Sequence, residues 1–262
     1  MKTMGQIYEG QKILTKTGYT ITVAKIVNKN NILVQYHDRH FQKVNYASLI
    51  QQNTINVFQP TNNGVGCKGL GNHPINRKVN GKNKHTKLYE TWTSLLKSMY
   101  NPRSKSYGKQ WMCNDWLNFQ EFSDWYEANY IELARGERLI LTNNLLDKNC
   151  TEFSPETSFL LPETIFKALH FKKTNEKESG LPIGVKVQKS LYAANIKKTI
   201  IVNNEFKSKG FYLGAFNTPE EAFNAYKVAK EEYLKELAER YIDYIPYKAY
   251  DALYNYTIEI DD

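Results

Sequence analysis

The sequence has few cysteines, and they form no metal-binding or disulfide pattern. Cys67, Cys113 and Cys150 are far apart in the 262-residue chain, odd in number and in no Cys-x-x-Cys pair. Structural zinc sites and disulfide frameworks use closely spaced or paired cysteines, so we expect three reduced thiols. Only His37 and His40 stand close together among the histidines, and no second ligand pair accompanies them. The sequence therefore predicts no metal and no other cofactor.

Long apolar runs are also missing. No segment approaches the roughly eighteen apolar residues of a membrane-spanning helix, and residues 1–6 lack the hydrophobic block of a signal peptide. We therefore expect no membrane contact and a location in the cytoplasm. The 41% hydrophobic and 13% aromatic content is sufficient for packed cores in two or three small domains.

Acidic residues are scarce in the first part of the chain. Residues 1–110 hold 17 Lys and Arg against 3 Asp and Glu, whereas residues 111–180 hold 7 against 12. The net charge of +8 is therefore concentrated towards the N-terminus. A surface built from these residues should attract phosphate groups.

Residues 5–58 alternate short apolar segments with polar turns, a pattern typical of short strands. We expect strands at residues 13–14, 19–27, 32–36 and 41–46. They predict a small β-barrel domain over residues 1–60. Two roles remain open for this domain, namely contact with the DNA backbone through its lysines or stabilisation of the rest of the chain.

Residues 61–88 are rich in glycine, asparagine and lysine. The Gly-x-Gly spacing at 64–66 is not followed by a Gly-Lys-Ser/Thr step, which argues against a nucleotide-binding loop. We interpret this stretch as a basic arm that lies along the DNA backbone, with a solvated linker as the alternative. The residues expected to contact DNA are Arg77, Lys78, Lys82 and Lys84.

Residues 89–172 are predicted to begin with a helix. The elements predicted after it come in the order typical of a ββα finger. Apolar residues at helical spacing predict a helix over 89–100, which Asn101-Pro102 ends. After an aromatic segment over 111–130 we expect a strand at 139–141, a polar turn, a strand at 159–161 and a helix that begins near Pro162.

Several landmarks resemble a known family. They are Trp92, Tyr100-Asn101-Pro102, Cys113-x-x-Trp116-x-x-Phe119-x-x-Phe122-x-x-Trp125 and Phe153-Ser154-Pro155-Glu156-Thr157. In this order they resemble the bacteriophage HNH endonucleases that carry a C-terminal plant-type, ethylene-response-factor-like DNA-binding domain. The resemblance covers nearly the whole chain. It implies an α+β protein with a degenerate ββα-metal core over 89–172, a linker over 173–182 and a three-stranded sheet packed on one helix over 183–262.

The resemblance also implies that the nuclease chemistry is lost. Family members resemble Leu-Asp-Lys-Asp-Ile-Leu where this chain has Leu-Thr-Asn-Asn-Leu-Leu at 141–146. Both carboxylates are absent, and no Mg²⁺ is expected unless the nuclease site still functions. The degenerate positions are Thr142, Asn144, Thr157 and Phe166. A residual nickase would need substitute ligands, for which Asp147, Glu152 and Glu156 are the candidates.

The C-terminal stretch predicts strands at 184–188, 192–198 and 199–206, with a further segment at 212–216. Thr218-Pro219-Glu220-Glu221 is a typical helix start. The segments Ile183-Gly184-Val185 and Leu213-Gly214-Ala215-Phe216 resemble the plant-type domain, which implies that strand side chains pointing away from the helix contact DNA in the major groove. The matching residues are Lys186, Lys189, Asn195 and Lys197, and the charge is extended by Lys198, Lys207 and Lys209.

The resemblance thus implies a phage-encoded protein that binds double-stranded DNA, derives from an HNH homing endonuclease and has no nuclease activity. Lysine in place of arginine favours phosphate contact over base reading. One alternative is an inhibitor or adaptor that binds a host protein through the former DNA surface. The other is a metal-dependent nickase.

Overall fold

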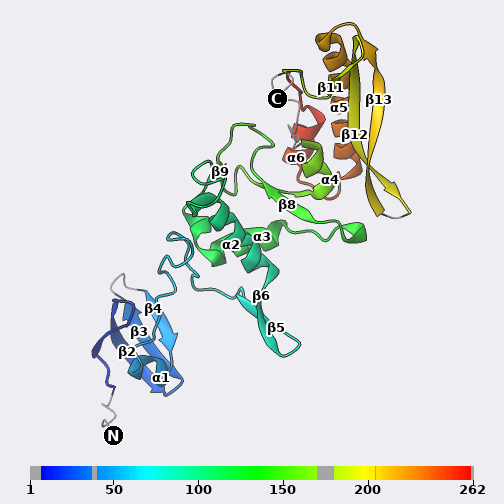
Figure 1. The fold of residues 1–262 in the computed structure, drawn as a ribbon. Coiled ribbons are helices and arrows are strands. Elements are labelled where there is room, and N and C mark those ends of the chain that lie inside the picture. Colours follow the sequence, from blue (N-terminus) through cyan, green and yellow to red (C-terminus); the bar gives the residue numbers. More distant parts are fainter. Residues whose placement is uncertain (1–6, 37–39, 170–179, 204, 261–262) are drawn as a thin grey trace. The chain divides into compact units, whose positions relative to one another are not determined.

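A computed structural model describes residues 7–36, 40–169, 180–203 and 205–260 (Figure 1). The chain has a mixed α+β fold with several small sheets. It divides into two compact units, one made of residues 1–102 and 117–122 and the other of residues 103–116 and 123–262. In the described part of the chain, no helix is both long and apolar enough to span a bilayer.

The first unit begins with a four-stranded antiparallel sheet in the order β1-β2-β3-β4. Ile21, Val23, Ile32 and Val34 are fully buried, so one face of the sheet carries the core of this part. The helix α1 follows directly after the last strand, and Asn45 caps it. The bounds of these elements are β1 Lys12–Leu14, β2 Thr20–Asn28, β3 Asn31–Tyr36, β4 Phe41–Val44 and α1 Tyr46–Ile50.

The expected closed barrel is wrong for the described residues. The first and last strands, β1 and β4, are the two edges of the sheet and do not pair with each other. A barrel needs every edge paired, but β1 has only three residues and the chain turns into α1 as soon as β4 ends.

The stretch predicted to be an arm or a linker contains a β-hairpin. The strands β5 (Asn76–Val79) and β6 (Lys82–His85) pair through an Asn80-Gly81 turn, in which both residues have positive φ. This pair suits a two-residue hairpin turn. The helix α2 (Lys87–Tyr100) follows, capped by Thr86, and ends at Asn101 as predicted.

The aromatic segment over 111–130 contributes to both units. In the first, Phe119 at the start of α3 (Phe119–Asn129) lies edge-on to Tyr89, with ring centroids 5.1 Å apart. In the second, Trp116 of the short 3-10 helix Asp115–Leu117 contacts Trp125 at 4.5 Å between ring centroids. The aromatic residues therefore form packed cores, which is their ordinary role.

The second unit contains the predicted strand, turn, strand and helix. The strands β8 (Leu139–Thr142) and β10 (Phe159–Pro162) are antiparallel, and α4 (Glu163–Leu169) follows at once. A shorter parallel pair is formed by β7 (Trp111–Met112) and β9 (Glu152–Phe153), and a second 3-10 helix covers Ala134–Gly136.

The C-terminal part is a three-stranded antiparallel sheet, β11-β12-β13, packed on a long helix, as expected. The expected break at 198/199 is wrong, because β12 runs on through β-branched residues to the turn that begins at Asn203. The helix α5 begins at Pro219 with a full capping box between Thr218 and Glu221. The bounds are β11 Val185–Gln188, β12 Leu191–Val202, β13 Glu205–Phe216, α5 Pro219–Arg240 and α6 Tyr247–Tyr254.

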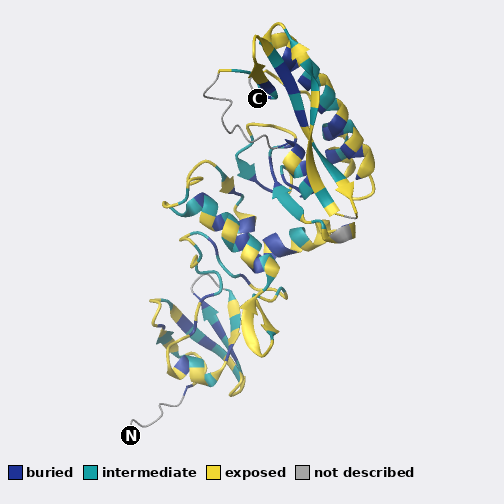
Figure 2. Ribbon diagram, turned by 45° about the vertical axis from the view of Figure 1, so that its right-hand side comes forward, coloured by how far each residue is buried: buried dark blue, intermediate teal, exposed yellow. Residues whose placement is uncertain are grey.

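The ββα element and the C-terminal sheet and helix share one hydrophobic core. Leu161 and Ile165 belong to the same buried cluster as Val185 and Leu237, and Figure 2 shows the buried residues along the sheet and α5. The Tyr241 hydroxyl also donates to Oε2 of Glu137 at 2.7 Å. The compact units thus differ from the predicted boundaries at 89 and 183. Most of the predicted linker at 173–182 lies outside the described residues.

Candidate nucleic-acid interface

The C-terminal sheet has one face covered by α5 and one face open. Side chains alternate between the faces along a strand, and directly paired residues share a face. Ala194 and Ile196 of β12 are buried in the core that includes α5. Asn195 and Lys197 therefore point to the open face, and the register of β11 against β12 places Lys186 on this face too.

Lys189 is in the turn between β11 and β12 rather than on a strand. It has φ +58°, and its side chain is exposed. Lys186, Lys189 and Lys197 form no ion pair with any residue that the structure describes. Their charges are therefore available to a ligand.

Lys198 belongs to the opposite face. It directly follows Lys197 in β12, and its Nζ is 3.1 Å from Oε1 of Glu236 on α5. The same ammonium group lies over the ring of Tyr233, 5.0 Å from the centroid. Lys198 thus joins the sheet to the helix and does not point towards the open side.

Lys207 and Lys209 share the helix side with Lys198. The register pairs Lys209 with Lys198 and Lys207 with Ile200. The Nζ of Lys207 is 3.5 Å from a carboxylate oxygen of Glu205. The lysines predicted to contact DNA are therefore divided between the two faces of the sheet.

Sequence reasoning missed Tyr212 on the open face. It lies opposite Asn195, and 59% of its surface is exposed. A bulge between Ala194 and Asn195 shifts the register by one residue, which brings Tyr212 to this face. No local sequence signal reveals such a shift, so the position could not be predicted.

Gly184 sets how closely α5 approaches the sheet. Its φ is +78°, a left-handed conformation that glycine adopts most readily. A Cβ atom there would overlap the ring of Tyr226 on α5. The glycine therefore permits the contact that leaves one sheet face free.

The β5–β6 hairpin presents a second group of cations. Arg77 pairs with Lys84, and Lys82 lies opposite Val79, so three cations share one face of the hairpin. Lys78 points to the other face. All four are exposed, and none forms an ion pair with a described residue.

The hairpin is tied to α2 at its base. The side chains of His85 and Asn76 are joined by a hydrogen bond of 2.8 Å. The His85 ring packs against Tyr89 of α2, with centroids 4.9 Å apart. The cations of the hairpin are thus carried by an ordered element, not by a free arm.

Two of the positions that the resemblance marks as degenerate, Thr142 and Asn144, are joined by a side-chain hydrogen bond. Thr142 at the end of β8 is buried, and its Oγ1 donates to Oδ1 of Asn144 at 2.6 Å. Between them, buried Asn143 donates to the carbonyl oxygens of Cys150 and Glu152. These polar groups stabilise the loop between the two strands.

Thr157 has a similar structural role. Its Oγ1 donates to the carbonyl oxygen of Glu152 at 2.8 Å and accepts a hydrogen bond from the backbone N–H of Ser154. Phe166 is half-buried on α4. At these positions the chain therefore offers hydroxyl, amide and aromatic groups, and no carboxylate.

The substitute ligands do not come together into a metal site. The carboxylate of Asp147 accepts a hydrogen bond from the backbone N–H of Asn149 in the turn, and Glu156 is exposed. Glu163 at the start of α4 was not among the candidates. It forms ion pairs with Arg138 and Lys167, and hydrogen bonds from Arg138 and then Lys167 lower the pKa of its carboxyl. Within the described ranges, no group of three or more His, Cys, Asp or Glu could hold a metal ion. The residues present therefore do not fit a Mg²⁺ centre.

The cysteines and histidines considered above as possible metal ligands have the following surroundings. All three cysteines are free thiols, and burial raises the pKa of Cys67 and Cys113. His40 stacks on Tyr36, with ring centroids 4.6 Å apart, whereas His37 is outside the described residues.

No model of a known protein family, no curated protein and no solved structure matches the chain.

Proposed function

We propose that this protein binds double-stranded DNA through the open face of its C-terminal sheet, and that it derives from a bacteriophage HNH homing endonuclease. The observation that carries the proposal is the placement of Lys186, Asn195 and Lys197 on one uncovered sheet face while α5 covers the other. The DNA major groove is wide enough for a two-stranded β-ribbon.

The side chains of this face suit contacts of two kinds. Lysine ammonium groups bind phosphate as point charges and carry little sequence information. Asn195 can form two hydrogen bonds with the edge of an adenine, and the neighbouring Tyr212 adds an aromatic surface. We therefore propose affinity that depends strongly on salt, with modest sequence preference.

The β5–β6 hairpin supports the same function. Arg77, Lys82 and Lys84 share one face and have no acidic partner among the described residues. Such a group of cations favours binding to a phosphate backbone, because each neutralised phosphate releases condensed counterions. In this proposal the hairpin adds backbone contacts, and the ββα element is retained as a scaffold without nuclease chemistry.

The test compares two pairs of lysines on opposite faces of the same sheet. Lys186→Ala with Lys197→Ala should lower the slope of log K against log salt by about 1.8, since each phosphate contact contributes about 0.9. Lys207→Ala with Lys209→Ala removes the same charge from the helix side and should change the slope much less. Equal slopes for both variants, measured by fluorescence anisotropy with a generic duplex, would place the DNA elsewhere.

A second candidate function is binding of a host protein, and one surface favours it. On α6 the rings of Tyr247, Tyr250 and Tyr254 stack in a row, with centroids 6.1 and 5.7 Å apart, and Tyr247 is 80% exposed. Burial, then Tyr254 and then Glu239 raise the pKa of Tyr250, so a carboxylate lies near the row.

Aromatic faces beside carboxylates attract arginine side chains. In this second proposal the partner is a protein segment rich in arginine. Titration of an octa-arginine peptide into the full chain should show binding that Tyr247→Ala weakens about tenfold and that Tyr8→Ala, at another exposed tyrosine, does not change. An equal effect of the two variants would exclude the row as the docking surface.

A further inference from the structure

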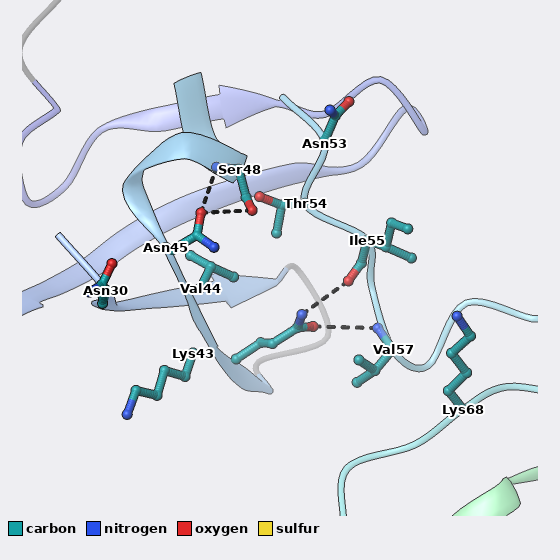
Figure 3. Close-up of a pocket in the computed structure, with 11 residues that line it drawn as sticks. Asn30, Lys43, Val44, Asn45, Ser48, Asn53, Thr54, Ile55, Val57 and Lys68 are labelled. Atoms are coloured by element: carbon teal, nitrogen blue, oxygen red, sulfur yellow. Dashed lines mark hydrogen bonds between the residues drawn. The ribbon is translucent and has the colours of Figure 1, made fainter. Parts of the chain in front are cut away.

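A groove of about 500 Å³ lies in the first unit, between β4, the start of α1 and the segment over 53–57 (Figure 3). Its lining shares no residue with the two surfaces proposed above to bind DNA. Lys43 and Lys68 lie at opposite sides of it, and the Asn45 side chain lies between them (Figure 3).

The groove is held open by hydrogen bonds of its own walls. The Nε2 of Gln42 donates to the carbonyl oxygen of Ile55 at 3.1 Å, and its Oε1 accepts from the backbone N–H of Val57 at 3.4 Å. One side chain thus joins the edge strand β4 to the opposite wall. The Oδ1 of Asn45 accepts two hydrogen bonds from Ser48, which fixes the Asn45 amide at the start of α1.

The lining has an excess of hydrogen-bond donors. The ammonium groups of Lys43 and Lys68 and the Nδ2 groups of Asn30 and Asn45 have no hydrogen bond or ion pair to a described residue. None of the described residues that line the groove is acidic. This combination favours a ligand that is anionic and rich in acceptor oxygens.

We propose that this groove binds the phosphodiester backbone of DNA, as a third contact that rests on the proposed DNA-binding function. A single small anion would need its cations to converge on one point. Here the two lysines stand at opposite sides of the groove, with the neutral amide of Asn45 between them (Figure 3). Donors spread out in this way suit successive phosphates of one strand better than an isolated ion.

The experiment uses the full chain and two matched double variants. Lys43→Ala with Lys68→Ala removes both cations of the groove. Lys12→Ala with Lys16→Ala removes two exposed lysines from the same part of the chain that do not line the groove. Salt-dependent anisotropy with a generic duplex should show a slope about 1.8 lower for the groove variant and a clearly smaller change for the control variant.

The source of the anion is tested by NMR. The side-chain amide resonances of Asn30 and Asn45 should shift when a short duplex is added to the wild-type protein. Inorganic phosphate at the same phosphate concentration should leave them unchanged. Equal shifts with inorganic phosphate would make the groove a small-anion site and overturn the DNA assignment.

The outcomes separate this inference from the function on which it rests. If the duplex binds, the sheet variant weakens binding and the groove variant does not, the groove inference alone is wrong. If the wild-type chain does not bind the duplex at all, the proposed function fails and the groove inference fails with it.

Discussion

Lys230 lies on the side of α5 that packs against the sheet, and only 4% of its surface is exposed. Burial, and then the positive charge of Lys198, lower the pKa of its ammonium group to about 8. In the unfolded chain the group keeps its ordinary pKa of 10.5. Between these two values the unfolded state binds more protons than the folded state, so the free energy of unfolding rises with pH over this window.

Below pH 8 the buried charge costs stability on the order of 3 kcal/mol, at 1.36 kcal/mol for each pKa unit. We therefore expect Lys230→Met to raise the free energy of unfolding at pH 7 by about 1–2 kcal/mol, since methionine fills a similar volume without charge. The gain should shrink as pH rises from 8 towards 10.5. Urea unfolding at pH 7 and pH 9.5 measures the gain in the free energy of unfolding and its decrease with pH. Lys186→Met, at an exposed lysine, is the control. A variant that is less stable than the wild type at pH 7 would contradict the prediction.

At the scale of elements, Thr142 and Asn144 of the ββα element are neutral side chains joined by a hydrogen bond, at positions where the proposed nuclease lineage would place carboxylates. The Oγ1 of Thr142 and the Oδ1 of Asn144 are 2.6 Å apart. Two carboxylates at these positions would repel each other in the absence of a cation. A divalent ion would relieve that repulsion and stabilise the folded state by mass action.

Introducing acids in the variant Thr142→Asp, Asn144→Asp and Phe166→Asn should therefore lower the melting temperature without metal. Added Mn²⁺ should raise it again by several degrees. The control Thr142→Asn with Phe166→Asn introduces no charge and should not respond to Mn²⁺, nor should the wild type. If the acidic variant does not respond either, β8 and α4 do not bring these positions together, and the likeness to a metal finger ends at the order of elements.

Capping residues and prolines in the sequence predicted the ends of helices that these residues themselves determine. Thr218, Pro219 and Glu221 mark the start of α5, and Asn101-Pro102 marks the end of α2, because caps and prolines act within one turn of a helix. The β5–β6 hairpin was missed because its strands lack alternating apolar residues, and only Asn80-Gly81 signals it.

The candidate site was predicted less completely than the fold. The sequence identified the lysines of the C-terminal sheet, but their division between two faces depends on the pairing of β12 with β13. A single bulge at Ala194/Asn195 shifts that pairing. The groove beside β4 depends on contacts between Gln42 and the segment over 55–57, which no sequence pattern records.

For the whole molecule, the two compact units have separate cores. In the first, Phe119 packs on Tyr89 and Trp92, and its backbone N–H donates to the carbonyl oxygen of Cys67. In the second, Gly184 permits the close approach of Tyr226 within the core that joins the ββα element to the C-terminal sheet. The unit boundary falls within α3, after Phe122.

Each core should therefore govern the local stability of its own unit. Phe119→Ala leaves a cavity that costs about 3–5 kcal/mol, and hydrogen exchange should accelerate in α2 and leave β12 protected.

Gly184→Ala forces a Cβ atom against the Tyr226 ring in a left-handed conformation, and exchange should accelerate in β12 and α5 but not in α2. Gly136→Ala is the control, since Gly136 has φ +66° and open space around its Cβ position, so only the backbone strain of about 1–2 kcal/mol remains. Mass-spectrometric hydrogen exchange on the full chain distinguishes these patterns. Acceleration in both units by either variant would mean that the protein unfolds as one cooperative body, and that the boundary within α3 does not separate two independently stable parts.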